Sequence, residues 1–174
     1  MMNNTTKNIF QMQHDKFLFL GKEYSDKELD FGKIFGDFFQ TGGYDQIIPH
    51  LKDKDDCCVD TLVFYKKSPE YKTVYIGRIV DEITTAPDDH VLETFPAGEF
   101  VVVTTEWQPT EGEAHQAIDE NEKTMQAPNG YERENESSPY ICGESSPYIC
   151  IEKMFECPER GHRWERWYPI RKVD

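Results

Sequence analysis

Two glutamates lie in aromatic-rich segments near the C-terminus, where a carboxylate could take part in chemistry. Glu152 is in SPYICIEKMF (146–155) and Glu165 is in RWERWYPI (163–170). Both segments favour strands, whose successive side chains point to opposite faces. This alternation places Glu165 on one face with Trp167, where a carboxylate and an indole together would suit an organic cation. The cation–π part of such a contact contributes about 0.5 to 2 kcal/mol.

The same alternation groups Tyr148 and Met154 with Glu152, on a face that we expect to line a ligand cavity. Ile151 and Phe155 fall on the opposite face, which we expect to meet a helix. Aromatic rings and a soft thioether can re-pack around varied compounds, so the first face is typical of a permissive site.

A plainer interpretation of both glutamates is that they project into solvent or pair with Lys153, Arg163 or Arg166. Acidic strand residues usually do so, because Asp and Glu are rarely buried. Two further ligand-site candidates, Trp107 and Tyr75, suit core packing equally well.

The sequence offers little for a metal. Its nearest motif is CPERGH, with Cys157 and His162, which lacks a second ligand pair. The remaining histidines share no spacing. We therefore expect neither a metal nor a cofactor.

The positioning elements follow from apolar periodicity. Strands are expected at 16–21, 58–65 and 71–80, then at 90–107 with an interruption at 96–98, and at 146–155 and 163–170. Helices are expected around a stripe from Phe31 to Phe39 and over 110–125. Each half then reads strand, helix, strand, strand. This order predicts an α+β fold with a pseudo-twofold duplication, an antiparallel sheet with helices on one face, and a ligand cleft on the other.

Composition limits the class of protein. The 174 residues suit one domain, expected over 8–174 with halves of about 8–85 and 86–174, after a disordered tail of residues 1–7. Asp and Glu number 33 against 19 Lys and Arg, a formal charge of −14 without a basic run, so direct nucleic-acid binding is not expected. No segment is apolar enough to enter a membrane, and five cysteines without a signal peptide suggest reduced thiols in the cytoplasm.

Four segments in order resemble the gyrase-inhibitor-like (GyrI-like) effector-binding family: FPAGEFVVV (95–103), NGYERE (129–134), SPYICIEKMF and RWERWYPI. The family includes the ligand-binding halves of AraC-type and MerR-type multidrug regulators. Its pattern carries two glutamates and a late proline, matched here by Glu152, Glu165 and Pro169. The similarity extends more loosely over most of 16–171.

The resemblance implies a stand-alone small-molecule-binding protein that senses or sequesters hydrophobic compounds, cationic ones among them, without its own DNA-binding domain. If it regulates transcription, it does so through another protein. One alternative is a hydrolase of cyclopropane-bearing alkylating compounds, with Glu152 or Glu165 as catalytic acid or base and Trp167 positioning the substrate. The other is an interaction protein that protects a partner such as gyrase.

A short stretch is doubled: ESSPYIC occurs at 136–142 and again at 144–150. Because two copies are too few for a repeat architecture, we interpret one copy as surplus. The second copy runs into IEKMF and is the one expected to begin the strand. The first copy is expected to form a loop or to replace its twin in the strand.

Overall fold

A computed structural model describes residues 7–52, 59–67, 72–81, 83–133 and 151–173; for residues 59, 60, 65–67, 72 and 133 it describes the backbone only. Lys7, from the expected tail, pairs with Glu106 at 2.7 Å, and the rest of that tail lies outside the described residues. The elements, in chain order, are β1 (Ile9–His14), β2 (Phe17–Asp26), α1 (Phe31–Gln40), the short 3-10 helix η1 (Ile48–His50), β3 (Val59–Lys67), β4 (Lys72–Val80), β5 (Val91–Phe95), β6 (Gly98–Thr104), α2 (Glu111–Glu122), β7 (Tyr131–Arg133), β8 (Ile151–Cys157) and β9 (Gly161–Lys172).

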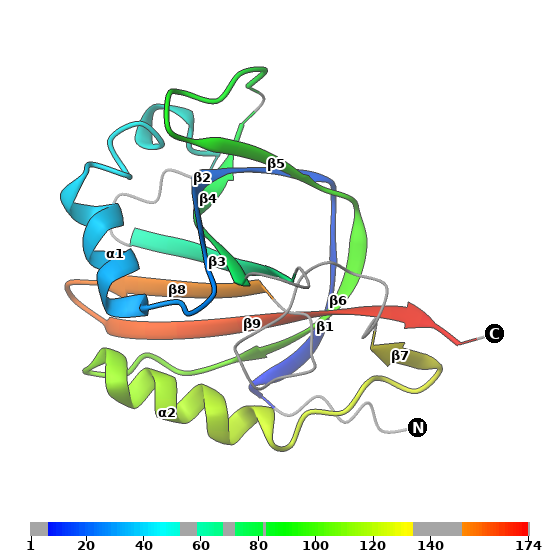
Figure 1. Cartoon of the computed structure of the whole chain (residues 1–174). Coiled ribbons are helices and arrows are strands. Elements are labelled where there is room, and N and C mark those ends of the chain that lie inside the picture. The colour runs from blue at the N-terminus through cyan, green and yellow to red at the C-terminus, as the bar shows by residue number, and fades with distance from the viewer. Residues whose placement is uncertain (1–6, 53–58, 68–71, 82, 134–150, 174) are drawn as a thin grey trace.

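The strands form one antiparallel sheet in the order β1-β6-β9-β8-β3-β4-β2-β5, with β7 also paired to β9. In this order the strands correspond in pairs about the centre of the sheet. β8 and β3 lie at the centre, β9 and β4 flank them, β6 and β2 follow, and β1 and β5 are the edges. The predicted α+β class, antiparallel sheet and helices on one face are confirmed (Figure 1). The duplication itself stays a prediction.

Two short links force this sheet to curl. β1 and β2 are six strands apart in the order, about 29 Å in a flat sheet, yet only residues 15 and 16 join them. That link reaches about 11 Å. Residues 96 and 97 join β5 to β6 under the same constraint. The two ends of the sheet must therefore approach each other, and Figure 1 shows both chain segments turning a corner between their strands.

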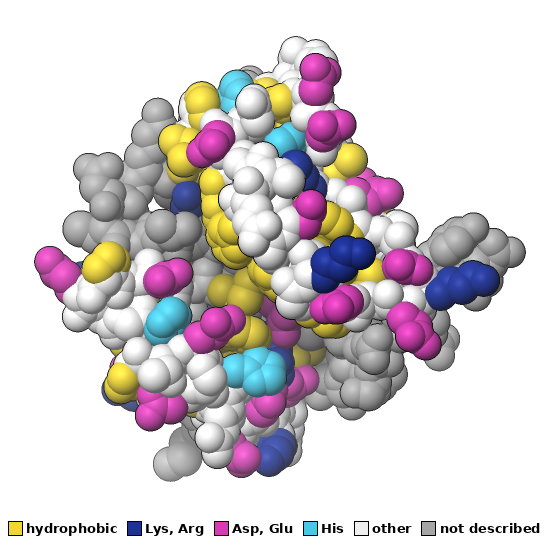
Figure 2. All heavy atoms as spheres, turned by 60° about the vertical axis from the view of Figure 1, so that its left-hand side comes forward, with side chains coloured by type: hydrophobic (Ala, Val, Ile, Leu, Met, Phe, Trp, Pro, Cys, Tyr) yellow, Lys and Arg dark blue, Asp and Glu magenta, His cyan; other side chains and the backbone are white. Residues whose placement is uncertain are grey.

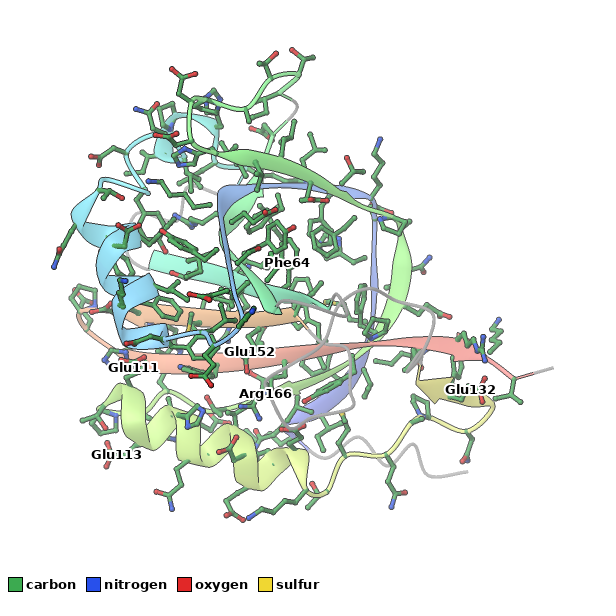
Figure 3. All side chains as sticks on the ribbon, viewed as in Figure 1. Phe64, Glu111, Glu113, Glu132, Glu152 and Arg166 are labelled. Atoms are coloured by element: carbon green, nitrogen blue, oxygen red, sulfur yellow. The ribbon has the colours of Figure 1, made fainter. Side chains whose placement is uncertain are left out.

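The inner face, on the side away from the helices, is filled with rings. Its aromatic cluster comprises Phe17, Phe19, Phe64, Tyr75, Phe95, Phe100 and Trp167, all buried. Phe17 stacks on Phe95 with ring centroids 4.6 Å apart, and Phe64 stacks on Tyr75 at 4.5 Å. The cluster therefore joins strands from both ends of the sheet, and Figure 3 shows Phe64 within the curve.

A pair of glycines permits the close approach of the paired strands β2 and β4. Gly21 is directly opposite Gly77. A Cβ at Gly77 would lie 2.1 Å from the Leu20 carbonyl oxygen and 2.7 Å from Cζ of Phe19. No side chain fits there, so glycine at these positions lets the strands approach and leaves room for the Phe19 ring.

The outer face carries both helices, and each begins at a side-chain cap. Asp30 accepts a hydrogen bond from the Lys33 amide at 3.0 Å, and Thr110 accepts one from the Glu113 amide at 3.2 Å. Helix α1 buries Ile34 and Phe38, whereas Phe39 of the same expected stripe is 54% exposed.

Helix α2 buries only Ala114 and Ile118. Figure 2 brings the left-hand side of Figure 1 forward and shows acidic side chains spread over this face, with hydrophobic ones in its middle.

Strands β1 and β7 were not predicted. β1 has the sequence IFQMQH, and Ile9 is its one buried residue. β7 has three residues. Both are fixed by pairing with β6 and β9 rather than by an apolar pattern, so periodicity gives them no strong signal.

Candidate functional site

Strand β9 has the predicted division of side chains. Glu165 and Trp167 lie on the inner face, where the Trp167 Nε1–H donates to Oε2 of Glu165 at 2.9 Å. On the outer face, Arg166 bonds to Asp119 of α2 and the Tyr168 hydroxyl donates to Glu122 at 2.5 Å.

For strand β8 the predicted division into two sets of side chains holds for the described residues, but the predicted assignment of the sets is wrong, because the two faces are exchanged. Met154 packs against the clusters beneath both helices, and Glu152 is on the same outer side. Ile151 lies in the inner aromatic cluster. The prediction assumed that helices cover the more apolar face. Instead, an arginine on β9 neutralises the glutamate under α2.

Glu152 is held in a buried ion network between the sheet and α2. The Arg166 Nε donates to Oε1 of Glu152 at 2.9 Å, while its Nη1 donates to Asp119 at 2.8 Å and also to Glu122 (Figure 3). The Arg166 side chain is 9% exposed.

Burial raises the pKa of the Glu152 carboxyl above its ordinary value, against the attraction of Arg166. Burial lowers the pKa of Arg166, but the attraction of Glu152 and Glu122 outweighs it and raises that pKa above its ordinary value. One of the plainer interpretations, a pair with Arg166, is therefore correct for Glu152.

Three cross-strand pairs bring ligand-type chemistry to the inner side of β8 and β9. Residues directly opposite one another are Ile151 and Trp167, Lys153 and Glu165, and Phe155 and Arg163. Side chains in such pairs lie on one face, close enough to interact. We call Lys153, Phe155, Arg163 and Glu165, with the neighbouring Trp107, the rim site; all five are partly exposed, and Trp167 is buried beside them.

The contacts within the rim site combine rings with charges. Arg163 Nη2 donates to Oε1 of Glu165 at 3.0 Å. The Arg163 guanidinium carbon lies 4.3 Å from the Phe155 ring centroid, and the Lys153 ammonium lies 5.0 Å from the same centroid. These distances are in the range of cation–π contacts. The arrangement can hold a flat hydrophobic group and compensate a charge on it.

The other predicted site residues divide between rim and core. The Trp107 ring is 6.5 Å from that of Phe155, so it belongs to the rim. Tyr75 is 3% exposed and stacked on Phe64, within the aromatic cluster. Tyr148 and both copies of ESSPYIC lie outside the described residues.

Sequence reasoning missed Lys153, Phe155 and Arg163 as site residues. Lys153 and Arg163 were considered only as ion-pair partners, and Phe155 was assigned to the helix side. The missing signal is the register between β8 and β9, which sets Phe155 opposite Arg163. Alternation along single strands cannot supply that register.

Among the described residues, no group of three or more His, Cys, Asp or Glu side chains is arranged to hold a metal ion. In that same part of the chain, no helix has the length and apolar character needed to cross a membrane.

Comparisons with solved structures show the fold. SAV2435 bound to tetraphenylphosphonium is 9% identical, with a TM-score of 0.63 and coverage of 94% of this chain and 93% of that one. An integron cassette protein from the mobile metagenome of Vibrio cholerae is 11% identical, with a TM-score of 0.54 and coverage of 95% and 97%. EcmrR in its complex with DNA is 12% identical, with a TM-score of 0.59, and the match covers 95% of this chain and 57% of that one.

The comparison with curated proteins found no match. A family model described as Cass2, integron-associated effector binding protein, matches residues 12–170. That range takes in both helices and nearly all of the sheet, and it agrees with the resemblance to GyrI-like effector-binding domains. The chain belongs to the Cass2 family of integron-associated effector binding proteins.

Proposed function

We propose that this protein binds small hydrophobic compounds with aromatic rings at the rim site, against Trp167. The observation that carries the proposal is the rim site itself, in which partly exposed rings and charged side chains adjoin a buried indole. Binding sites for small molecules combine apolar walls with a few placed polar groups in this way. Family membership supports small-molecule binding, and the relative bound to tetraphenylphosphonium, an ion with four phenyl groups, supports aromatic ligands.

A cationic ligand is one form of this proposal, with Glu165 as the counter-charge. Glu165 is on the inner face beside Trp167, whereas Glu152 faces α2 and is paired with Arg166. The two glutamates therefore have different expected roles, and only Glu165 belongs to the proposed site.

The proposed role is sensing or sequestration of the ligand. The formal charge of −14 disfavours direct contact with nucleic acid. A transcriptional response to the ligand would then pass through another protein, as the sequence led us to expect.

The contacts of Glu165 support our proposal of ligand binding rather than ligand hydrolysis. Of the two candidate carboxylates, Glu165 alone lies at the rim site, and each of its oxygens already accepts a hydrogen bond, from Arg163 or from Trp167. Its described contacts show no general base set up to activate water.

The test is a calorimetric titration of the protein with tetraphenylphosphonium, tetraphenylborate and neutral triphenylphosphine oxide. We expect at least one of these compounds to bind. We expect Trp167→Phe to weaken that binding by about tenfold, since an aromatic contact contributes ~1 kcal/mol beyond its buried area and the smaller ring also buries less.

Trp164→Phe is the matched control. Trp164 is a buried tryptophan of the same strand, but it packs with α2 on the outer face. Its substitution should leave affinity unchanged. Absence of binding by all three compounds, or equal losses in the two variants, would contradict the proposed function at this site.

A further inference from the structure

Lys153 already occupies the place that a ligand cation would take at the rim site. It projects from β8 on the inner side, and its ammonium lies 5.0 Å from the Phe155 ring centroid and 5.9 Å from that of Trp167. Both distances are those at which a ring attracts a cation. The rings of the proposed site therefore have a protein cation over them.

The one carboxylate of the rim site is compensated as well. Glu165 is directly opposite Lys153 across the strands, and its two oxygens accept from Arg163 Nη2 at 3.0 Å and from Trp167 Nε1 at 2.9 Å. An incoming cation would have to compete with Arg163 for this carboxylate.

The third ring, Trp107, is also next to cations. The guanidinium carbons of Arg163 and Arg160 lie 5.5 and 5.8 Å from its centroid. Each ring of the site, Trp107, Phe155 and Trp167, thus has a described Lys or Arg within cation–π distance. Arg163 Nε is buried and has no hydrogen-bond partner in the described part of the chain.

We propose that Lys153 sets the charge preference of the rim site and makes it select anionic aromatic compounds over cationic ones. This inference rests on the proposed function. A cation must displace the ammonium or share the rings with a like charge, and such like-charge contact is a means of rejecting a ligand. An aromatic anion instead gains the field of Lys153 and Arg163.

Because the whole molecule is negatively charged, a preference for an anionic ligand would indicate the action of local groups. At a formal charge of −14, the long-range field attracts cations and repels anions. Tighter binding of an anion would therefore oppose the overall charge and would point to local groups, whose part the variants then measure.

The experiment uses the full chain with tetraphenylborate and tetraphenylphosphonium, which share one shape and have opposite charges. We expect tetraphenylborate to bind the wild type about tenfold more tightly, from local cation contacts of the usual strength. Lys153→Met retains the length of the side chain and should shift the affinity ratio toward tetraphenylphosphonium by about tenfold. Glu165→Gln removes a negative charge from the same site and should shift the ratio the opposite way.

Lys123→Met is the control for net charge, because Lys123 is exposed on the far end of α2, where it pairs with Glu120 at 2.6 Å. The ratio of the affinities for the two ions should be the same in Lys123→Met as in the wild type. A wild type that prefers tetraphenylphosphonium, or a ratio that Lys153→Met leaves unchanged, overturns the role of Lys153 while the proposed function stands. If the wild type binds neither ion nor triphenylphosphine oxide, the proposed function fails, and this inference fails with it.

Discussion

At the scale of single residues, Glu152 and Glu165 show how one side-chain type takes two roles in neighbouring strands. Glu165 has 13% of its side chain exposed at the rim and bonds to Trp167. Glu152 is buried under α2, where Arg166 is shared with Asp119 and Glu122. Burial penalises the charged form of Glu152, so its pKa is raised.

This raised pKa predicts a pH dependence of stability. The folded state holds the Glu152 proton more tightly than the unfolded chain does, so the stabilisation is complete below the ordinary pKa of 4.5. It is lost as pH rises through the raised value. The stability of the wild type relative to Glu152→Gln should therefore fall as pH rises above 4.5, as measured by urea unfolding at each pH.

Glu159→Gln is the control for this titration, because Glu159 is exposed in the turn between β8 and β9. Its stability difference from the wild type should not change over the same pH range. A wild-type advantage over Glu152→Gln that grows with pH would show that the attraction of Arg166 outweighs burial.

At the scale of elements, the position of the rings depends on how closely the paired strands β2 and β4 approach each other. Gly21 and Gly77 face each other, and the Phe19 ring lies against both. The rim site is a few strands away, but its Trp167 belongs to the same buried cluster as Phe19. The glycine pair therefore supports the inner face that backs the proposed site.

We predict that Gly77→Ala lowers the free energy of unfolding by about 1 to 3 kcal/mol, the usual cost of forcing extra atoms into a packed core. Its Cβ would meet backbone atoms at 2.1 and 2.6 Å. Gly36→Ala is the matched control in α1, at a partly exposed position where a Cβ meets nothing within 4 Å. There alanine should stabilise by about 0.5 to 1 kcal/mol. Chemical denaturation measures both, and equal effects would contradict the packing argument.

At the scale of the whole molecule, the pairing of β7 and β8 along one edge of β9 explains how the chain can carry the doubled ESSPYIC stretch. β7 ends at Arg133, opposite Ile170, and β8 begins at Ile151, opposite Trp167. At Ile170, β6 pairs with the opposite edge of β9, so β7 and β8 pair one after the other with the same edge of β9. The two ends are about 10 Å apart, at ~3.3 Å for each residue step. The segment 134–150 has more residues than are needed to span this distance.

We predict that deletion of residues 136–143 leaves both thermal stability and ligand affinity unchanged. The remaining residues, 134, 135 and 144–150, still reach about 30 Å when extended. Intact mass of the wild-type protein would establish beforehand that both copies are present.

Deletion of residues 144–151 is the matched control, since it gives the same sequence except that Gly143 takes the place of Ile151. Ile151 is 3% exposed in the aromatic cluster, so this second deletion should cost at least about 2 kcal/mol. Similar losses in both deletions would show that the first copy is needed.

By itself, the sequence determined the family resemblance, the α+β class, both helices and most strands, because apolar periodicity and the order of segments are local properties. It also determined that Glu165 shares a face with Trp167, since that follows from alternation within β9.

Only the tertiary structure decided which face of β8 meets the helices and which residues complete the site. Alternation divides a strand into two sets of side chains without stating which set faces the helices. That choice depends on the β8–β9 register and on the curl of the sheet, which fills the inner face with rings. It also depends on Arg166, which allows Glu152 to be buried beneath α2 and so leaves Lys153 and Phe155 beside Glu165.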